Sequence, residues 1–406
     1  MNPPHPSLLQ SLRALPRTAW ILFFGTFLNK FGTFVMPFLT LYLTGRGFSL
    51  AQTGTAVGAY GAGYFVASFL GGYLSDRIGR RNTIALSMFS GAGAMLLLSQ
   101  ARTFPALVGL TFLAGLTSEL YRPASSALLG DLTPPGQRLT AFSAYRVAFN
   151  AGWAFGPATA GFLAAHSYSW LFWGNALTSA LYGVVALALL PHGVRARRNE
   201  SGWGPALRAL RRDAPFQQTL LASLATGFVF FQIATTLGLA MTNRGFSPST
   251  YGAVLSLNGV LIVLFELPTI TFTRRFPARR VMAVGFILIA LGFSLNAFAR
   301  TAGELRLCMA LFTLGEMIAM PVSIAYTADL CPPEMRGRYM GAFGLTWAIS
   351  MTLAPVIGMR LFGIAPALLW AAGAVAGVTA AAVISVKVES RSPVPSDAPE
   401  PARLAS

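Results

Sequence analysis

Ionisable side chains stand at several points inside long apolar stretches of this sequence. The proton-coupling candidates among them are Lys30, Glu119, Arg122, Arg146 and Glu316. A charge at bilayer depth is costly, so such residues tend to mark paths for protons, ions or substrates. An acid beside a cation stays ionised, and it takes up a proton when the cation is drawn away. We therefore expect proton coupling or binding of a charged substrate at these positions.

The stretches around these residues have the length of membrane-spanning helices. The chain of 406 residues is 54% hydrophobic and 11% charged, with a mean hydropathy of +0.59. Soluble domains carry about 25% charged residues, and a helix needs about 20 apolar residues to cross a bilayer. The sequence predicts twelve spans, at residues 18–43, 52–74, 82–101, 104–130, 138–165, 168–190, 216–243, 250–273, 281–298, 304–330, 337–361 and 364–386.

The charged groups occupy two depths in these predicted helices. A rise of 1.5 Å per residue places Lys30, Glu119 and the polar Asn150 about 18 Å from the cytoplasmic helix ends. Arg122 and Arg146 lie about 12 Å from those ends by the same count. Arg122 is one helical turn from Glu119 and competes for its carboxylate.

The net charge of +17 reflects orientation in a membrane. With the N-terminus inside, most basic residues fall in cytoplasmic segments, as the positive-inside rule requires. Both termini are then cytoplasmic, and the basic loops meet anionic lipid. A nucleic-acid partner is not expected, because no soluble basic module with stacking aromatics is present.

The chain repeats itself at a spacing of 198 residues. Residues 44–49, TGRGFS, return at 242–247 as TNRGFS, and residues 131–138 return at 329–336. Two matching apolar halves predict two helical bundles around a shared site, the plan of secondary transporters. We expect pseudo-symmetric six-helix bundles at residues 1–190 and 216–387.

The segment between the halves, residues 191–215, is predicted to be a cytoplasmic linker. Trp203, Leu207 and Leu210 have the spacing of one helix face, so an amphipathic helix on the inner leaflet is one interpretation. A solvated basic linker is the other. The Pro-rich tail, residues 388–406, is predicted to be disordered.

The stretch GYLSDRIGRR follows the second predicted helix. Its defining residues are Gly72, Asp76, Arg77, Gly79, Arg80 and Arg81. The pattern resembles the cytoplasmic loop signature of the major facilitator superfamily. The resemblance implies an all-α integral membrane fold with 12 transmembrane helices. It also implies that Asp76 braces the N-terminus of the eleventh helix near Arg336 in the outward-open state, with Arg138 as ionic partner. The alternative is that these charges only set topology.

The fifth predicted helix carries a second pattern. Gly152, Gly156, Pro157, Ala160 and Gly161 resemble the antiporter signature of drug:proton antiporters, although Ala160 replaces a glycine. Small residues there would let the helix approach the other bundle closely, and the proline would bend it. Together with the loop signature, this favours export by antiport.

The resemblance also places charges near one another. In this superfamily the first and fourth helices line a central cavity, so it implies an ion pair between Lys30 and Glu119. That pair is either a proton switch or a permanent structural bridge. Glu316 aligns with Ser118 across the repeat and could attract cationic substrates or be the proton site. Glu266 is expected to pack at the interface or to bind an arginine.

Aromatic and polar residues near the expected cavity could hold a substrate by stacking and cation–π contacts. The candidates are Phe34, Phe38, Tyr145, Asn150, Trp153, Phe231, Gln232 and Trp347.

Other function classes lack their residues. The two lysines, Lys30 and Lys387, follow no Gly-rich loop, so no Walker-type ATP site is predicted. His5, His166 and His192 form no zinc site or catalytic triad. We therefore expect that the protein is not an enzyme and binds no cofactor or metal. We expect a proton gradient to supply the energy for transport.

The sequence thus predicts a monomeric transporter of a bacterial cytoplasmic membrane, exporting amphipathic small molecules in exchange for protons by alternating access. Alternatives are a narrow exporter or proton symporter for a sugar, amino acid, siderophore or other anionic solute, and a non-transporting membrane sensor. Arg122 and Arg146 would suit an anionic solute, because arginine binds carboxylate or phosphate bidentately.

Overall fold

The computed structural model of the chain describes residues 12–134, 137–192, 210–211, 213–331 and 336–386. Within these ranges the secondary structure is helical and contains no strand, which confirms the predicted all-α class. The first half forms α2 (Arg17–Phe31), α3 (Val35–Gly45), α4 (Leu50–Ile78), α5 (Arg80–Gln100), α6 (Phe104–Glu119), α7 (Tyr121–Leu132), α8 (Arg138–His166) and α9 (Ser169–Leu189). The second half forms α11 (Ala214–Ile233), α12 (Thr236–Thr242), α13 (Pro248–Thr273), α14 (Ala278–Ser294), η2 (Leu295–Ala297), α15 (Ala302–Leu330), α16 (Arg336–Ile364) and α17 (Pro366–Ser385).

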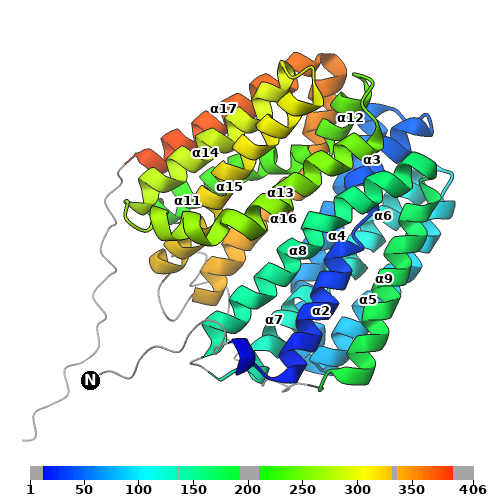
Figure 1. Cartoon of the computed structure of the whole chain (residues 1–406), viewed down its shortest axis with the longest axis vertical. Helices are drawn as coiled ribbons and strands as arrows, with labels where there is room; N and C mark the ends of the chain where they lie inside the picture. Colours follow the sequence, from blue (N-terminus) through cyan, green and yellow to red (C-terminus); the bar gives the residue numbers. More distant parts are fainter. Residues whose placement is uncertain (1–11, 135–136, 193–209, 212, 332–335, 387–406) are drawn as a thin grey trace, which may run out of the picture.

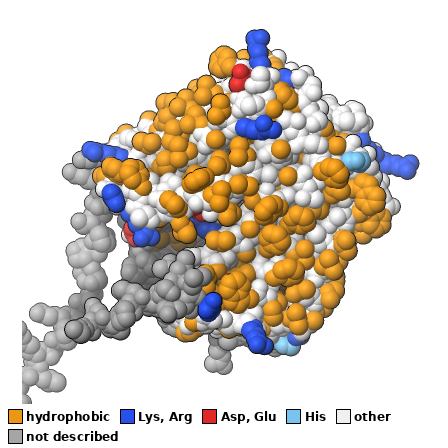
Figure 2. All heavy atoms as spheres, in the orientation of Figure 1, with side chains coloured by type: hydrophobic (Ala, Val, Ile, Leu, Met, Phe, Trp, Pro, Cys, Tyr) orange, Lys and Arg blue, Asp and Glu red, His pale blue; other side chains and the backbone are white. Residues whose placement is uncertain are grey.

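Ten helical segments of the described chain are long and apolar enough to cross a membrane. Broken helices such as α2–α3 count as one segment. Of the twelve predicted spans, those at α4 and α8 fall outside this set, and their crossing stays a prediction. Figure 2 shows hydrophobic side chains over most of the visible face. Large apolar residues such as Phe162, Trp170 and Leu267 are more than half exposed, as expected for a surface that faces lipid.

The helices gather into two bundles that lie side by side (Figure 1). One contains α2–α9 and the other α11–α17, with α3 and α12 next to each other at one end. Residues 193–209 and 387–406, which contain most of the predicted linker and the tail, lie outside the described residues.

The repeated TGRGFS and TNRGFS segments build the same turn twice. Gly47 and Gly245 have φ angles of 85° and 84°, a left-handed conformation that glycine adopts without strain. The side chains of Ser49 and Ser247 then accept hydrogen bonds from backbone N–H groups and cap α4 and α13.

Arginines of the same motif hold each turn in place. Arg46 donates to the carbonyl of Ala101 at 2.6 Å, and Arg244 donates to that of Ala299 at 2.9 Å. All four residues keep the 198-residue spacing. The repeated motif therefore has a structural role, because it ties two helix connections together in each half.

Close contacts between the bundles gather at the end where α3 and α12 meet, which we call the closed end. On α4, a Cβ at Gly58 would lie 2.5 Å from the carbonyl oxygen of Thr352, and one at Gly61 would lie 2.5 Å from the Thr352 nitrogen. Tyr251 also donates to the carbonyl of Pro37 at 3.1 Å. Only glycine allows backbones of α4 and α16 to approach this closely.

The fifth predicted helix, α8, corrects one expectation. Gly152 and Gly156 face Phe31 of α2 in their own bundle, rather than the other bundle. The residues that meet α13 of the other bundle are Ala154 and Gly161, together with the carbonyl of Pro157. A helix in this position needs small residues on two faces, and the pattern alone did not assign each residue to its face.

Candidate functional site

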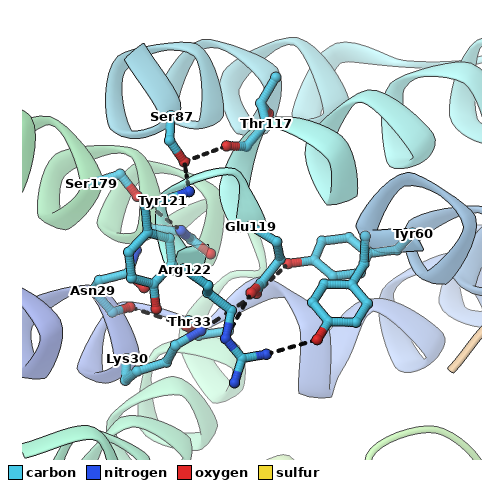
Figure 3. Close-up of polar contacts among 12 residues, drawn as sticks. Asn29, Lys30, Thr33, Tyr60, Ser87, Thr117, Glu119, Tyr121, Arg122 and Ser179 are labelled. Atoms are coloured by element: carbon cyan, nitrogen blue, oxygen red, sulfur yellow. Dashed lines mark hydrogen bonds and ion pairs between the residues drawn. The ribbon is translucent and has the colours of Figure 1, made fainter. Parts of the chain in front are cut away.

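A buried carboxylate, that of Glu119, lies at the centre of the polar cluster in the first bundle (Figure 3). Lys30 Nζ lies 3.4 Å from its Oε1, and the hydroxyl of Tyr60 donates to the same oxygen at 3.5 Å. Arg122 Nε lies 3.7 Å from Oε2. The expected ion pair between Lys30 and Glu119 is thus present, and one carboxylate is shared between two cations.

The two cations differ in their exposure. The side chain of Lys30 is 7% exposed and lies over the rings of Tyr121 and Phe149. The side chain of Arg122 is 42% exposed, and its guanidinium donates to the hydroxyl of Tyr64 at 3.1 Å. Arg122 is therefore the cation that a solute can reach, whereas Lys30 is held inside the bundle.

A break in the helix places Glu119 and Arg122 in this geometry. Pro123 lacks an N–H and cannot continue the helical ladder, so α6 ends at Glu119 and α7 begins at Tyr121. Ser87 of α5 binds both sides of the break, donating to the carbonyl of Thr117 at 2.6 Å and accepting from the Tyr121 N–H at 3.2 Å. One buried hydroxyl thus satisfies the backbone next to the carboxylate.

One acid of the second bundle, Glu316, is held by an amide and not by an ion pair. Asn258 of α13 donates to Glu316 Oε2 at 2.7 Å and to the Thr313 hydroxyl at 3.0 Å. Within the described residues, no lysine or arginine lies within 4.0 Å of Glu316. The intramembrane acids Glu119 and Glu316 therefore differ in their partners, since Glu119 contacts two cations and Glu316 contacts an amide.

Arg146 of α8 and Glu266 of α13 form an ion pair that joins the two bundles. This is the arginine contact expected for Glu266. Arg146 is also one of the proton-coupling candidates, and that role stays a prediction. Its guanidinium is bound to an acid of the opposite bundle and remains 43% exposed.

The loop signature builds the connection between α4 and α5. Gly79 has a φ of 90°, which glycine adopts readily. Beyond it, Arg80 forms an ion pair with Asp131 at the end of α7, and Arg81 lies 2.6 Å from the His192 ring. Arg77 donates to the hydroxyl of Tyr73. The basic residues of the signature thus hold the ends of α4, α5, α7 and α9 together.

One expectation for this region is not met among the described residues, and another stays a prediction. Among the described residues no ion pair joins Asp76 to Arg138, which instead donates to the carbonyl of Gly130 at 3.4 Å. A Cβ at Gly72 would meet nothing within 4 Å, whereas one at Gly71 would lie 2.5 Å from the Leu120 oxygen. Gly71 is therefore the contact position. The side chain of Arg336 lies outside the described part of the chain.

Aromatic side chains of α11 and α16 form a group in the second bundle. Trp347 lies 5.5 Å from Phe230 and 6.1 Å from Phe231, both edge to face. All three rings are half-buried. In the first bundle, Tyr145, Asn150 and Trp153 of α8 are half-buried too. These candidates keep surface that a solute could contact.

Three predicted cavity residues serve packing instead. Phe38 is fully buried and lies 5.2 Å from Tyr251 at the closed end, and Phe34 is buried against Phe31. Gln232 is fully buried and donates to the carbonyl of Ala354 at 2.8 Å. Phe34 and Gln232 stand next to the breaks that end α2 and α11, and Phe38 lies in the first turn of α3.

Several site residues were missed from the sequence. Tyr60 and Tyr64 follow one face of α4 at a spacing of four, a signal that is also typical of packing. Ser87 and Asn258 are single polar residues in apolar helices, and that rarity is the signal that could have identified them. Nowhere in the described chain do three His, Cys, Asp or Glu side chains gather as a metal site.

Known proteins resemble this chain over most of its length. YqjV, an MFS-type transporter of Bacillus subtilis, is 26% identical over 85% of this chain and 87% of its own length. The Na⁺, Li⁺, K⁺/H⁺ antiporter of Planococcus maritimus is 24% identical over 81% and 86%. The multidrug resistance protein MdtH of Aeromonas hydrophila is 25% identical over 82% and 84%.

Solved structures share the fold. A crystal structure of the nucleoside transporter NupG has a TM-score of 0.80, covering 90% of this chain and 98% of that one at 16% identity. The family profile described as Major Facilitator Superfamily matches residues 22–247 and again residues 219–406, one match for each half. The two matches together span nearly the whole chain, so this protein belongs to the Major Facilitator Superfamily.

Proposed function

We propose that this membrane transporter exports amphipathic small molecules in exchange for protons, in a bacterial cytoplasmic membrane and with both termini inside. The observation that carries the proposal is the Glu119 carboxylate, buried and shared between Lys30 and Arg122. An acid with two cations stays ionised, and it takes up a proton once a cation leaves it. Arg122 is the cation positioned to leave, because it is half exposed and already bonded to Tyr64.

Alternating access supplies the event that moves the cation. The bundles meet at the closed end through backbone contacts of α4 with α16. Toward the other end of α8 and α13 they are joined by the ion pair of Arg146 and Glu266. Rocking of the bundles about these contacts would change the access of water and solute to Arg122, whose guanidinium lies 5.5 Å from the ring of Phe149 in the same bundle.

The second bundle favours cationic, partly apolar solutes. Glu316 has an amide partner rather than a cation, so it can attract positive charge. The rings of Phe231 and Trp347 offer faces for stacking and for cation–π contact. Two relatives, a multidrug resistance protein and a cation/proton antiporter, support a cationic solute.

A second candidate is transport of an anionic metabolite. It is supported by the exposure of Arg122 and Arg146, which leave guanidinium surface available to a carboxylate or phosphate. In that case the solute itself would displace Glu119 from Arg122. The two candidates differ in the charge of the solute and share the same coupling acid.

Proteoliposomes separate these candidates. Purified protein is reconstituted with a pH-sensitive dye inside and a fixed proton gradient, and lipophilic cations, organic anions and sugars are added in turn. Proton release triggered by several unrelated cations supports multidrug antiport. A response to one anion alone would replace that proposal with the second candidate.

A further inference from the structure

A groove of about 520 Å³ opens on the outer face of the second bundle, away from the acid at Glu316. Its lining includes Phe272 of α13, Phe276 in the turn after α13, Val284 of α14, and Leu314 and Ile318 of α15. Phe272, Phe276 and Val284 are each more than half exposed. These helices are among the candidate membrane spans, so the groove faces the acyl-chain region of a bilayer.

The repeat shows a packing difference between the two halves at the position of this groove. In the first bundle, a Cβ at Gly71 of α4 would lie 2.5 Å from the Leu120 oxygen, so the helix is pressed against its neighbour. At the 198-residue spacing, Gly71 corresponds to Thr269 and Leu120 corresponds to Ile318. Both of these residues line the groove. A side chain at Thr269 holds α13 away from α15 where glycine in α4 allows contact.

One end of the groove carries unpaired positive charge. Arg280 is a lining residue, and Arg274 and Arg275 stand in the turn that connects α13 to α14. All three are exposed, and none has an acidic partner among the described residues. Arg279 differs, because it donates to the carbonyls of Ile384 and Val386.

The same comparison of halves shows a difference in charge at this turn. Arg274 occupies the position that corresponds to Asp76 in the first half, and Arg280 corresponds to Asn82. The second turn therefore has arginine where the first has an acid, and a further arginine at the mouth of the apolar groove.

From this juxtaposition we infer that the groove binds one phospholipid with an anionic headgroup. Its acyl chain lies along Phe272, Val284 and Ile318, and its phosphate contacts Arg280 with support from Arg274. A membrane-depth apolar channel that ends in basic residues suits this class of ligand, because both parts of the molecule find their complement. The site is independent of the transport pathway between the bundles.

Native mass spectrometry tests this inference directly. Intact protein is extracted in detergent and incubated with equal amounts of phosphatidylglycerol and phosphatidylcholine that carry the same acyl chains. We expect one phosphatidylglycerol to stay bound at collision energies that strip phosphatidylcholine. Arg280→Gln should lower phosphatidylglycerol retention about fivefold, the effect of one basic residue near an anionic surface. Val284→Trp should fill the groove and lower retention of both lipids.

Matched controls use residues elsewhere on the exposed surface. Arg17→Gln removes an exposed arginine at the corresponding end of α2, and Val375→Trp enlarges an exposed residue of α17. Both should bind lipid as the unsubstituted protein does. Melting temperature without lipid checks that each variant is folded, and the rise on adding phosphatidylglycerol should be smaller for Arg280→Gln than for the parent protein.

Three results would overturn the inference. Equal retention of the two lipids would show that the anionic headgroup is not recognised. Unchanged retention in both groove variants would show that the lipid binds somewhere other than this groove. Displacement of phosphatidylglycerol by inorganic phosphate or by a lipophilic cation would make the groove a site for a soluble ion or a substrate.

Discussion

Arg146 and Glu266 belong to different halves of the repeat and bind each other across the interface between the two bundles. An ion pair at this position holds α8 and α13 together by the attraction between opposite charges. Removing one partner leaves the other charge uncompensated between the bundles. The resulting loss of stability is larger than the stability that the intact pair contributes.

The first prediction concerns this bridge. Arg146→Gln and Glu266→Gln should each lower transport of a responsive solute about tenfold, because one charge is left unpaired between the bundles. The exchanged double variant, Arg146→Glu with Glu266→Arg, should recover most of the loss. Initial rates in proteoliposomes of equal protein content measure this. Additive losses in the exchanged variant would show that the two residues act separately.

Ser87 gives a prediction about stability. Ser87→Ala should lower the free energy of unfolding by about 1–3 kcal/mol, because the buried N–H of Tyr121 loses its acceptor. Ser90→Ala is the matched control, since Ser90 bonds only within its own helix. Thermal unfolding in detergent compares them. Equal melting temperatures for the two variants would contradict the role assigned to Ser87.

The repeat shows which parts of the fold could be predicted from sequence. The turn of Gly47 and its copy at Gly245 follow from local chemistry, because positive φ and a serine cap are encoded within a few residues. The positions of apolar spans are likewise local. The ion pair of Lys30 with Glu119 followed from a family resemblance applied to those spans, and it is present.

The faces of the helices could not be predicted in the same way. Phe38 and Gln232 lie beside helix breaks, and their side chains are buried in packing rather than exposed to a solute. Whether a residue points inward depends on where each helix breaks and how its neighbours rotate. Those are properties of the packed bundle. For the same reason, Tyr60 could not be predicted from sequence as a partner of Glu119.

The closed end supplies a third prediction. Gly61→Ala should lower transport strongly, because the added Cβ would meet the backbone of Met351 and Thr352 at 2.5 Å. Gly93→Ala is the control, since a Cβ there meets nothing within 4 Å, and it should stabilise its helix by about 0.5–1 kcal/mol. Transport rates are compared at equal membrane abundance. Normal transport by Gly61→Ala would contradict the need for this close approach.

Asp76 provides a fourth prediction. It is exposed here, and the bundles meet at the opposite end of α4, so we expect the brace implied by the family resemblance to form in the other state of the cycle. Asp76→Asn should therefore slow transport while leaving the melting temperature of this state unchanged. Normal transport at normal abundance would show that the charge serves topology alone.

Proton coupling through Glu119 is the central claim, and one comparison tests it most directly. Reconstituted Glu119→Gln is assayed for proton-driven transport and for counterflow, the exchange of labelled for unlabelled solute without a gradient, beside Glu316→Gln. We predict that Glu119→Gln loses proton-driven transport and keeps counterflow. The two bundles of this variant still rock, but residue 119 can no longer bind and release a proton. Intact proton-driven transport in Glu119→Gln, or its loss in Glu316→Gln alone, would contradict the account and move the coupling site to the second bundle.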